Sequence, residues 1–145
     1  MSDDTLGRPI EILLVEDNPG DVRLTIEALK EGKVRNSLSV ARDGVEALAF
    51  LRREGPHANA ARPDLILLDL NMPRMNGLEF LRALRDDPEL RATPVVVLTT
   101  SNDDRDRLQS YAHNVAGYLV KPVASPAFVE LMTALNAYWS RVELP

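Results

Sequence analysis

Short apolar runs rich in β-branched residues alternate along the chain with longer segments that repeat at helical spacing. The apolar runs cover residues 10–15, 38–41, 64–68, 94–99 and 116–120, and their length and continuous hydrophobicity are typical of strands buried on both faces. Strands that alternate with helices predict a parallel sheet, because each parallel connection needs a crossover. Right-handed crossovers leave few topologies, so we expect an α/β fold with a five-stranded parallel sheet of order 2-1-3-4-5 and helices on both faces.

The segments between the runs carry helix signals. Asn18-Pro19 is an N-cap followed by proline at the first helical position, and the apolar stripe of Val22, Ile26 and Leu29 should end at Gly32. Further helices are predicted around residues 45–52, around 78–84, near 103–113 in a more polar segment, and after the pair 125–126. Residues 54–63 are predicted to form a surface loop.

Composition limits the domain organisation and the class of partner. The 145 residues fit one domain, which we place at 9–139 between an N-terminal tail at 1–8 and a C-terminal extension at 140–145, with no output domain. A net charge of −5 argues against a nucleic-acid partner, and the absence of cysteine excludes thiolate chemistry. No apolar run approaches the ~20 residues of a membrane helix, and the acidic start is unlike a signal peptide, so a cytoplasmic protein that does not enter a membrane is expected.

Polar side chains with complementary chemistry follow four of the predicted strands. The first strand leads into Glu16-Asp17, the third into Asp69, the fourth into Thr99 and the fifth into Lys121. Each of these residues alone is more often an ordinary surface, turn or capping residue. In a sheet of the predicted order, however, the carboxyl ends of the strands meet at one edge, where the reversal of strand order forms a binding crevice.

Three carboxylates at one edge repel one another, so the cluster needs positive charge. Lys121 supplies one charge, and a hard divalent cation such as Mg²⁺ supplies two and expects phosphate oxygens among its remaining ligands. Asp69 is then suited to act as a nucleophile toward a phosphoryl donor and to form an aspartyl phosphate. Lys121 would neutralise charge on the phosphoryl oxygens, and the Thr99 hydroxyl would donate a hydrogen bond to one of them.

These residues, together with Met72-Pro73, Gly77, Tyr118 and Pro122, resemble the receiver domain of two-component response regulators over roughly residues 9–139. The resemblance implies a flavodoxin-like receiver fold and a phosphoacceptor signalling protein, which assists its own phosphorylation and dephosphorylation but is not an enzyme. The implied partner is a sensor histidine kinase whose phosphohistidine donates its phosphoryl group to Asp69.

The resemblance also implies a role for each residue of the site. Mg²⁺ would be bound by the side chains of Asp17 and Asp69 and by the backbone carbonyl of Asn71, with Glu16 acting through water. Lys121 would contact the phosphoryl group, Thr99 and Tyr118 would form the switch pair, and the peptide bond before Pro122 would be cis. Glu16 departs from the aspartate most common at this position, and its longer arm makes Asp17 the expected direct ligand.

A narrower resemblance concerns the kinase. Residues 16–21, 98–101 and 138–145 are similar to the stand-alone receivers that pair with bacterial phytochrome kinases. This likeness implies a bacteriophytochrome partner and a red/far-red light pathway.

An apolar tail predicts an oligomer. Its residues are Tyr138, Trp139, Val142 and Leu144, and one small domain cannot bury them all without the chain folding back. A homodimer formed by the last helix, the neighbouring strand and this tail would cover them symmetrically. The alternative is a tail that lies on its own domain.

Three other functions are compatible with parts of the pattern. An enzyme of the haloacid-dehalogenase type expects a second acid two residues after its nucleophile, where this chain has Asn71. A flavodoxin-like electron carrier expects a hydroxyl-rich phosphate loop where Glu16-Asp17 would repel a phosphate. A receiver-like scaffold that is never phosphorylated stays open as the alternative, although the intact set of acids, threonine and lysine argues against it.

Overall fold

A computed structural model describes residues 9–70, 72, 74–99, 115, 117–120, 126, 129–131 and 133–134, with only the backbone of Thr99, Tyr118 and Val120. The strands are β1 (Ile10–Val15), β2 (Asn36–Ala41), β3 (Leu65–Asp69), β4 (Val95–Thr99) and β5 (Gly117–Val120). All four pairings are parallel and give the order β2-β1-β3-β4-β5, which confirms the predicted α/β topology. The connections contain α2 (Pro19–Glu31), α3 (Gly44–Leu51), a 3-10 turn η1 (Gly55–His57) and α4 (Gly77–Asp86).

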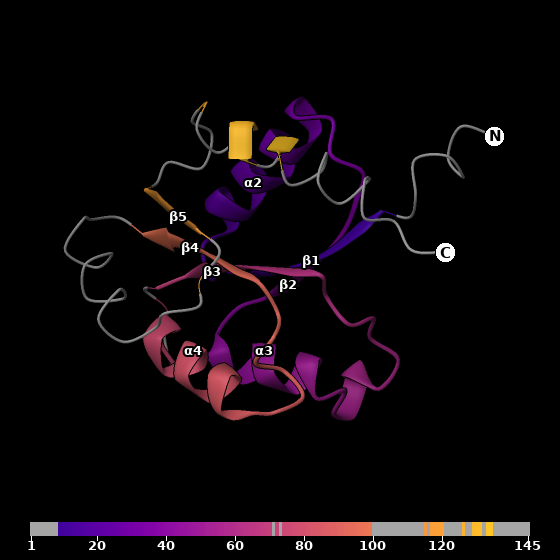
Figure 1. Cartoon of the computed structure of the whole chain (residues 1–145), viewed down its shortest axis with the longest axis vertical. Coiled ribbons are helices and arrows are strands. Elements are labelled where there is room, and N and C mark those ends of the chain that lie inside the picture. The colour runs from indigo at the N-terminus through magenta and orange to yellow at the C-terminus, as the bar shows by residue number, and fades with distance from the viewer. Residues whose placement is uncertain are drawn as a thin grey trace.

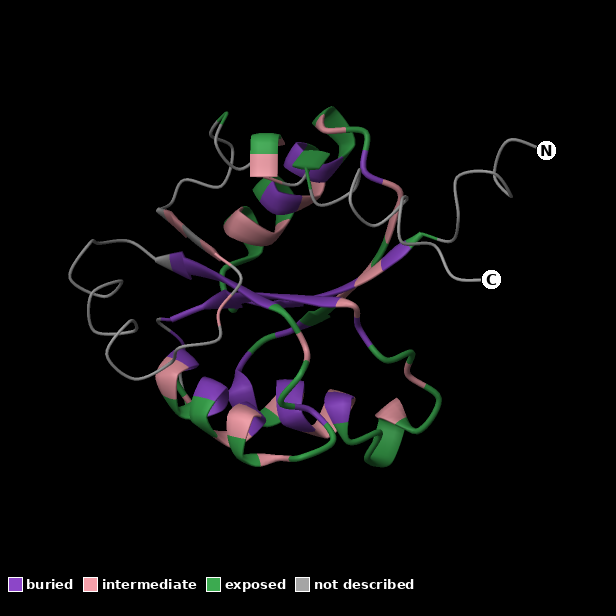
Figure 2. Cartoon of the chain, viewed as in Figure 1, coloured by how far each residue is buried: buried purple, intermediate pink, exposed green. Residues whose placement is uncertain are grey.

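Helices cover both faces of the sheet, as predicted. Figure 1 shows α2 on one face and α3 with α4 on the other. Successive strand residues point to opposite faces, so Leu13 and Val15 pack with α3 and α4, whereas Ile12 and Leu14 pack with α2. The central strands are therefore buried on both sides (Figure 2), which explains their continuous apolar runs.

The start of α2 follows the predicted capping chemistry, but its buried face is rotated. The side chain of Asn18 accepts hydrogen bonds from the amides of Gly20 (2.8 Å) and Asp21 (3.1 Å), with Pro19 at the first helical position. The buried residues are Thr25, Ala28 and Leu29, whereas Val22 and Ile26 of the predicted stripe are only half-buried. Thr25 tolerates burial because its hydroxyl donates to the carbonyl of Asp21 (2.8 Å).

Gly32 ends α2, as predicted, and the left-handed residue is the one that follows it. Gly32 is the C-cap, but its φ is −77°, and the left-handed residue is Lys33, with φ of 58°. The amide of Lys33 donates to the carbonyl of Lys30 (3.0 Å), and the amide of Val34 donates to that of Leu29 (3.0 Å). This is a Schellman ending, and the buried side chains of Val34 and Leu29 belong to the same apolar cluster.

The end of α3 repeats this geometry with another basic residue. Arg53 has φ of 56°, its amide donates to the carbonyl of Phe50 (3.1 Å), and the amide of Glu54 donates to that of Ala49 (2.9 Å). A cationic side chain also interacts favourably with the negative end of the helix dipole.

Several predicted features lie outside the described residues. They are the helix at 103–113, the site residues Asn71, Lys121 and Pro122, and the tail residues Tyr138, Trp139, Val142 and Leu144.

Val129 and Leu131, which are helical, pack on the same face of the sheet as α2. No helix in the described part of the chain is long and apolar enough to cross a membrane.

Lys33→Gly should stabilise the protein. A left-handed backbone costs a residue with a Cβ atom about 1–2 kcal/mol, and the extra freedom of glycine in the unfolded chain returns about 0.5–1 kcal/mol of that. We therefore expect the free energy of unfolding to rise by about 0.5–1 kcal/mol in urea denaturation. Lys33→Ala is the matched control and should show no such gain, so an equal gain in both variants would contradict the explanation.

Candidate functional site

Three acidic residues meet at the carboxyl ends of neighbouring strands. Glu16 and Asp17 follow β1 and Asp69 ends β3, and the two strands pair with Val15 opposite Leu68. Carboxylate oxygens of the three acids all lie within 4.8 Å of one another. Glu16 is 1% exposed and Asp69 is 3% exposed, whereas Asp17 is exposed to solvent. The site is therefore a cluster of two buried acidic residues and one that is exposed to solvent.

Backbone hydrogen bonds hold this group of acids in place. The amide of Glu16 donates to the carbonyl of Ala41 at the end of β2 (2.9 Å), which ties the acid to the edge strand. The Glu16 carboxylate accepts a hydrogen bond from the amide of Asn18 (3.3 Å), the N-cap of α2. The acids thus lie beside the positive end of a helix dipole, which favours negative charge there.

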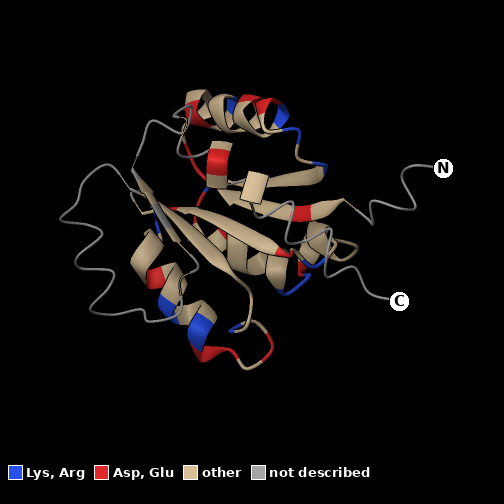
Figure 3. Ribbon diagram, turned by 45° about the horizontal axis from the view of Figure 1, so that its top comes forward, with Lys and Arg blue, Asp and Glu red and all other residues tan. Residues whose placement is uncertain are grey.

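The donor set of the site fits a hard divalent cation. All three side chains offer carboxylate oxygens, which are the ligands that Mg²⁺ and Mn²⁺ prefer. Two of them are buried, and buried like charges need compensating positive charge. Figure 3 shows that the ribbons of the strands are mostly uncharged and that the charged residues lie mainly on helices and loops.

The structure places the backbones of the predicted switch residues in the two strands beyond Asp69. Thr99 is the last residue of β4 and pairs with Val120 of β5, and Tyr118 of β5 pairs with Val97. The amide of Leu70 donates to the carbonyl of Leu98 (3.3 Å), so the chain leaving Asp69 stays beside the end of β4.

The loop after Asp69 brings Gly77 into close contact with the backbone of Asp69 and Leu70. The amide of Gly77 donates to the carbonyl of Leu70 (3.0 Å). A Cβ atom on Gly77 would lie 2.6 Å from Cα of Leu70 and 2.8 Å from the carbonyl oxygen of Asp69. Only glycine permits this approach, which explains its place in the motif and fixes the start of α4 against the backbone of Asp69.

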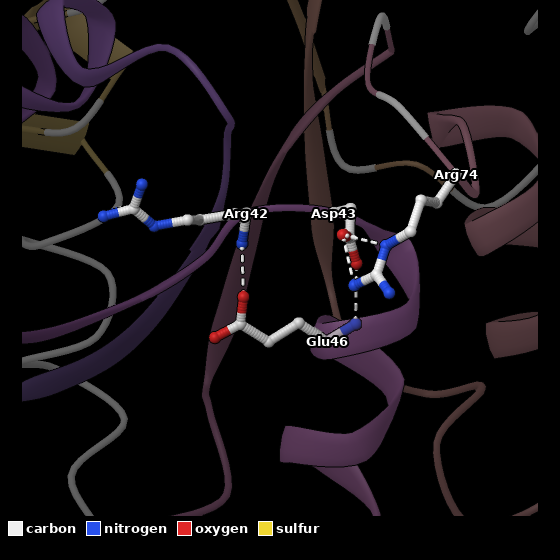
Figure 4. A network of polar contacts seen from close by, with 4 residues as sticks. All are labelled: Arg42, Asp43, Glu46 and Arg74. Carbon is white, nitrogen blue, oxygen red and sulfur yellow. Dashed lines mark hydrogen bonds and ion pairs between the residues drawn. The ribbon is translucent and has the colours of Figure 1, made fainter.

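A second polar network, which the sequence interpretation missed, lies beside this loop (Figure 4). Asp43 caps α3 by accepting a hydrogen bond from the amide of Glu46 (2.8 Å). Its other oxygen accepts a hydrogen bond from Nε of Arg74 (2.7 Å) and lies 2.6 Å from Nη2 of the same guanidinium. The spacing of Asp43 and Glu46 before an apolar helix signals the cap, but no sequence pattern reveals that Arg74 reaches it.

The environment of Asp43 favours its charged form. Burial acts to raise the pKa of the Asp43 carboxyl, but hydrogen bonds from the Glu46 amide and Arg74, the charge of Arg74 and a hydrogen bond from the Val45 amide outweigh it. The net result is a pKa below the ordinary value.

Comparison with known proteins gives consistent results. The family described as response regulator receiver domain matches residues 12–134. Response regulator Rcp1 of Synechocystis sp. is 41% identical over 146 residues, which cover 100% of this chain and 99% of that protein.

Two solved structures extend the likeness to the fold. The phosphorylated cyanobacterial phytochrome response regulator RcpA is 44% identical, with a TM-score of 0.76 and coverage of 90% of this chain and 94% of its own. The Mn(2+)-bound form of response regulator Rcp1 is 41% identical, with a TM-score of 0.76 and coverage of 94% and 99%.

The lowered pKa of Asp43 predicts a pH-dependent contribution to stability. The contribution is complete above the ordinary pKa of 3.8 and is lost as the pH falls through the lower pKa of the folded state. Asp43→Asn keeps an acceptor for the α3 cap but removes the titration. The free energy of unfolding of the wild type should exceed that of the variant at about pH 7, and the difference should shrink toward about pH 3. A difference that stays constant over this range, measured by urea denaturation, would contradict the assignment.

Proposed function

The chain belongs to the response regulator receiver family, and on this premise we propose that Asp69 is its phosphoacceptor and that a sensor histidine kinase is the donor. The observation that carries the proposal is the meeting of the Glu16, Asp17 and Asp69 carboxylates within 4.8 Å. Asp69 stands at the end of a central strand with its backbone held by α4, so its carboxylate has a fixed position for attack.

In this proposal, a carboxylate oxygen of Asp69 attacks the phosphorus atom while the bond from phosphorus to the histidine nitrogen of the donor breaks. The Lys121 ammonium and the Thr99 hydroxyl contact the phosphoryl oxygens and offset their charge. The side chains of Asp17 and Asp69 and the Asn71 carbonyl hold Mg²⁺, and Glu16 acts through a water molecule. The bound cation supplies positive charge to the phosphoryl oxygens.

The response to phosphorylation is proposed to pass through Thr99 and Tyr118. Their backbones lie in β4, which pairs with the strand of Asp69, and in β5, which pairs with β4. A Thr99 hydroxyl drawn toward the phosphoryl group would leave space for the Tyr118 ring to turn inward. The phosphorylated state would then be favoured by differential contacts with these two residues.

The kinase is proposed to be a bacterial phytochrome. Support comes from the likeness to RcpA, which is described as a cyanobacterial phytochrome response regulator, and from the near-complete mutual coverage with Rcp1. Transfer from a phytochrome kinase that is faster than transfer from an unrelated histidine kinase would support this pairing.

Asp69→Asn should abolish phosphorylation. Incubation of the wild-type protein with acetyl phosphate and Mg²⁺ should add the mass of one phosphoryl group, detected by mass spectrometry of the intact protein. Asp86→Asn is the matched control, because it changes the charge equally at an exposed residue that ends α4. Retention of the mass gain in Asp69→Asn, or no gain in the wild type, would contradict the phosphoacceptor assignment.

Asp17→Ala should weaken Mg²⁺ binding more than about tenfold, because it removes a direct ligand from a site with few protein ligands. Glu16→Gln should have a smaller effect, since Glu16 acts through water. Isothermal titration calorimetry measures both affinities. Equal Mg²⁺ affinity in Asp17→Ala and the wild type would overturn the assignment of the site.

A further inference from the structure

The loop between β3 and α4 is attached at its base and at its tip. At the base, the amide of Gly77 bonds to Leu70 and leaves no room for a Cβ atom beside Asp69. At the tip, Arg74 and Met75 contact Asp43 and Gly44. Asn71, whose carbonyl is a proposed ligand of the cation, lies between base and tip in the sequence.

The tip is held by three different kinds of contact. The guanidinium of Arg74 pairs with Asp43 at 2.6 and 2.7 Å. The amide of Gly44 donates to the carbonyl of Met75 (3.3 Å). A Cβ atom on Gly44 would lie 2.8 Å from Cγ and 2.9 Å from Cβ of Met75. The two segments therefore pack so closely that only glycine fits at position 44.

The backbone conformation of Arg74 is unusual. Arg74 has φ of 65°, a left-handed conformation that a residue with a Cβ atom adopts only where its surroundings impose it. Figure 4 shows the Arg74 side chain reaching across to Asp43, while the Arg42 side chain points away from that pair. The ion pair therefore orients the loop tip, although 62% of the Arg74 side chain is exposed.

Asp43 is a fixed anchor for this contact. Its side chain is only 8% exposed, and it caps α3 through the amide of Glu46. The end of β2 just before it is bonded to the amide of Glu16 through Ala41. The anchor is thus tied to the same strand end that carries the first acid of the site.

We propose that the Arg74–Asp43 ion pair is a positioning contact that holds the loop after Asp69 in the conformation that binds the cation, although neither residue is among the proposed ligands. The proposal rests on the proposed function, because it concerns the Mg²⁺ site. Without the pair, the loop spends less time in the competent conformation. The apparent association constant for Mg²⁺ then falls in proportion to the fraction of molecules whose loop has the competent conformation.

Arg74→Ala should weaken Mg²⁺ binding about three- to tenfold in calorimetry, as expected for loss of a charge-assisted contact to a buried carboxylate. Asp43→Asn, which keeps the cap acceptor, should weaken binding by a similar factor. The double variant should be no weaker than either single variant, because both remove the same contact. Higher ionic strength should narrow the difference between wild type and variants, since the pair is accessible to salt.

Phosphorylation by acetyl phosphate separates positioning from general damage. At low Mg²⁺ the Arg74→Ala rate should fall with the lost affinity, and at saturating Mg²⁺ it should return to the wild-type rate. Arg53→Ala is the matched control: it removes the same charge from another left-handed arginine, at the opposite end of α3. It should leave Mg²⁺ binding unchanged.

Each outcome has a defined meaning. Unchanged Mg²⁺ affinity in Arg74→Ala, additive effects in the double variant, or a rate loss that persists at saturating Mg²⁺ would overturn the positioning role while leaving the proposed function intact. A wild-type protein that binds no Mg²⁺ and gains no phosphoryl group would overturn the proposed function, and the positioning role with it.

Discussion

The mutual repulsion of three carboxylates is the constraint on which the rest of this structure depends. Glu16, Asp17 and Asp69 bring their oxygens within 4.8 Å, and two of the three are buried. Such an arrangement costs free energy unless cationic groups compensate it. The protein keeps it because two adjacent parallel strands end there, and because α2 directs the positive end of its dipole toward the same place.

The fold supplies the rigidity that this arrangement needs. The central strands are buried on both faces, so the register between β1 and β3 cannot slip without exposing apolar side chains. Close backbone contacts at two glycines then hold the neighbouring loops against the rest of the fold. Gly77 fixes α4 against Asp69, and Gly44 lets the loop that follows Asp69 meet α3. The Arg74–Asp43 pair belongs to this framework, since it joins a loop of the site to a helix cap outside it.

Much of the fold followed from the sequence because periodicity and capping are local. The strand order, the Asn18 cap and the two-sided burial were all predicted, and so was the family. The buried face of α2 was predicted in part: Leu29 is buried and Val22 packs against the core, but Thr25 was not expected there and is buried because its hydroxyl is satisfied within the helix. The left-handed Lys33 was not predicted, because the Schellman ending of α2 has a lysine at the position where glycine is usual. Arg74 was missed for a different reason: it pairs with a residue 31 positions away, which no local pattern reveals.

The dependence of stability on Mg²⁺ tests the central claim most directly. If the three acids form one cation site in the folded state, Mg²⁺ should raise the free energy of unfolding, by about 2.7 kcal/mol at a concentration one hundred times its dissociation constant. The gain should be absent when Glu16, Asp17 and Asp69 are replaced together by Gln, Asn and Asn, and this variant should be more stable than the wild type in the absence of divalent cations. Urea denaturation with and without Mg²⁺ measures both quantities. A wild-type free energy of unfolding that does not change with Mg²⁺ would contradict the account.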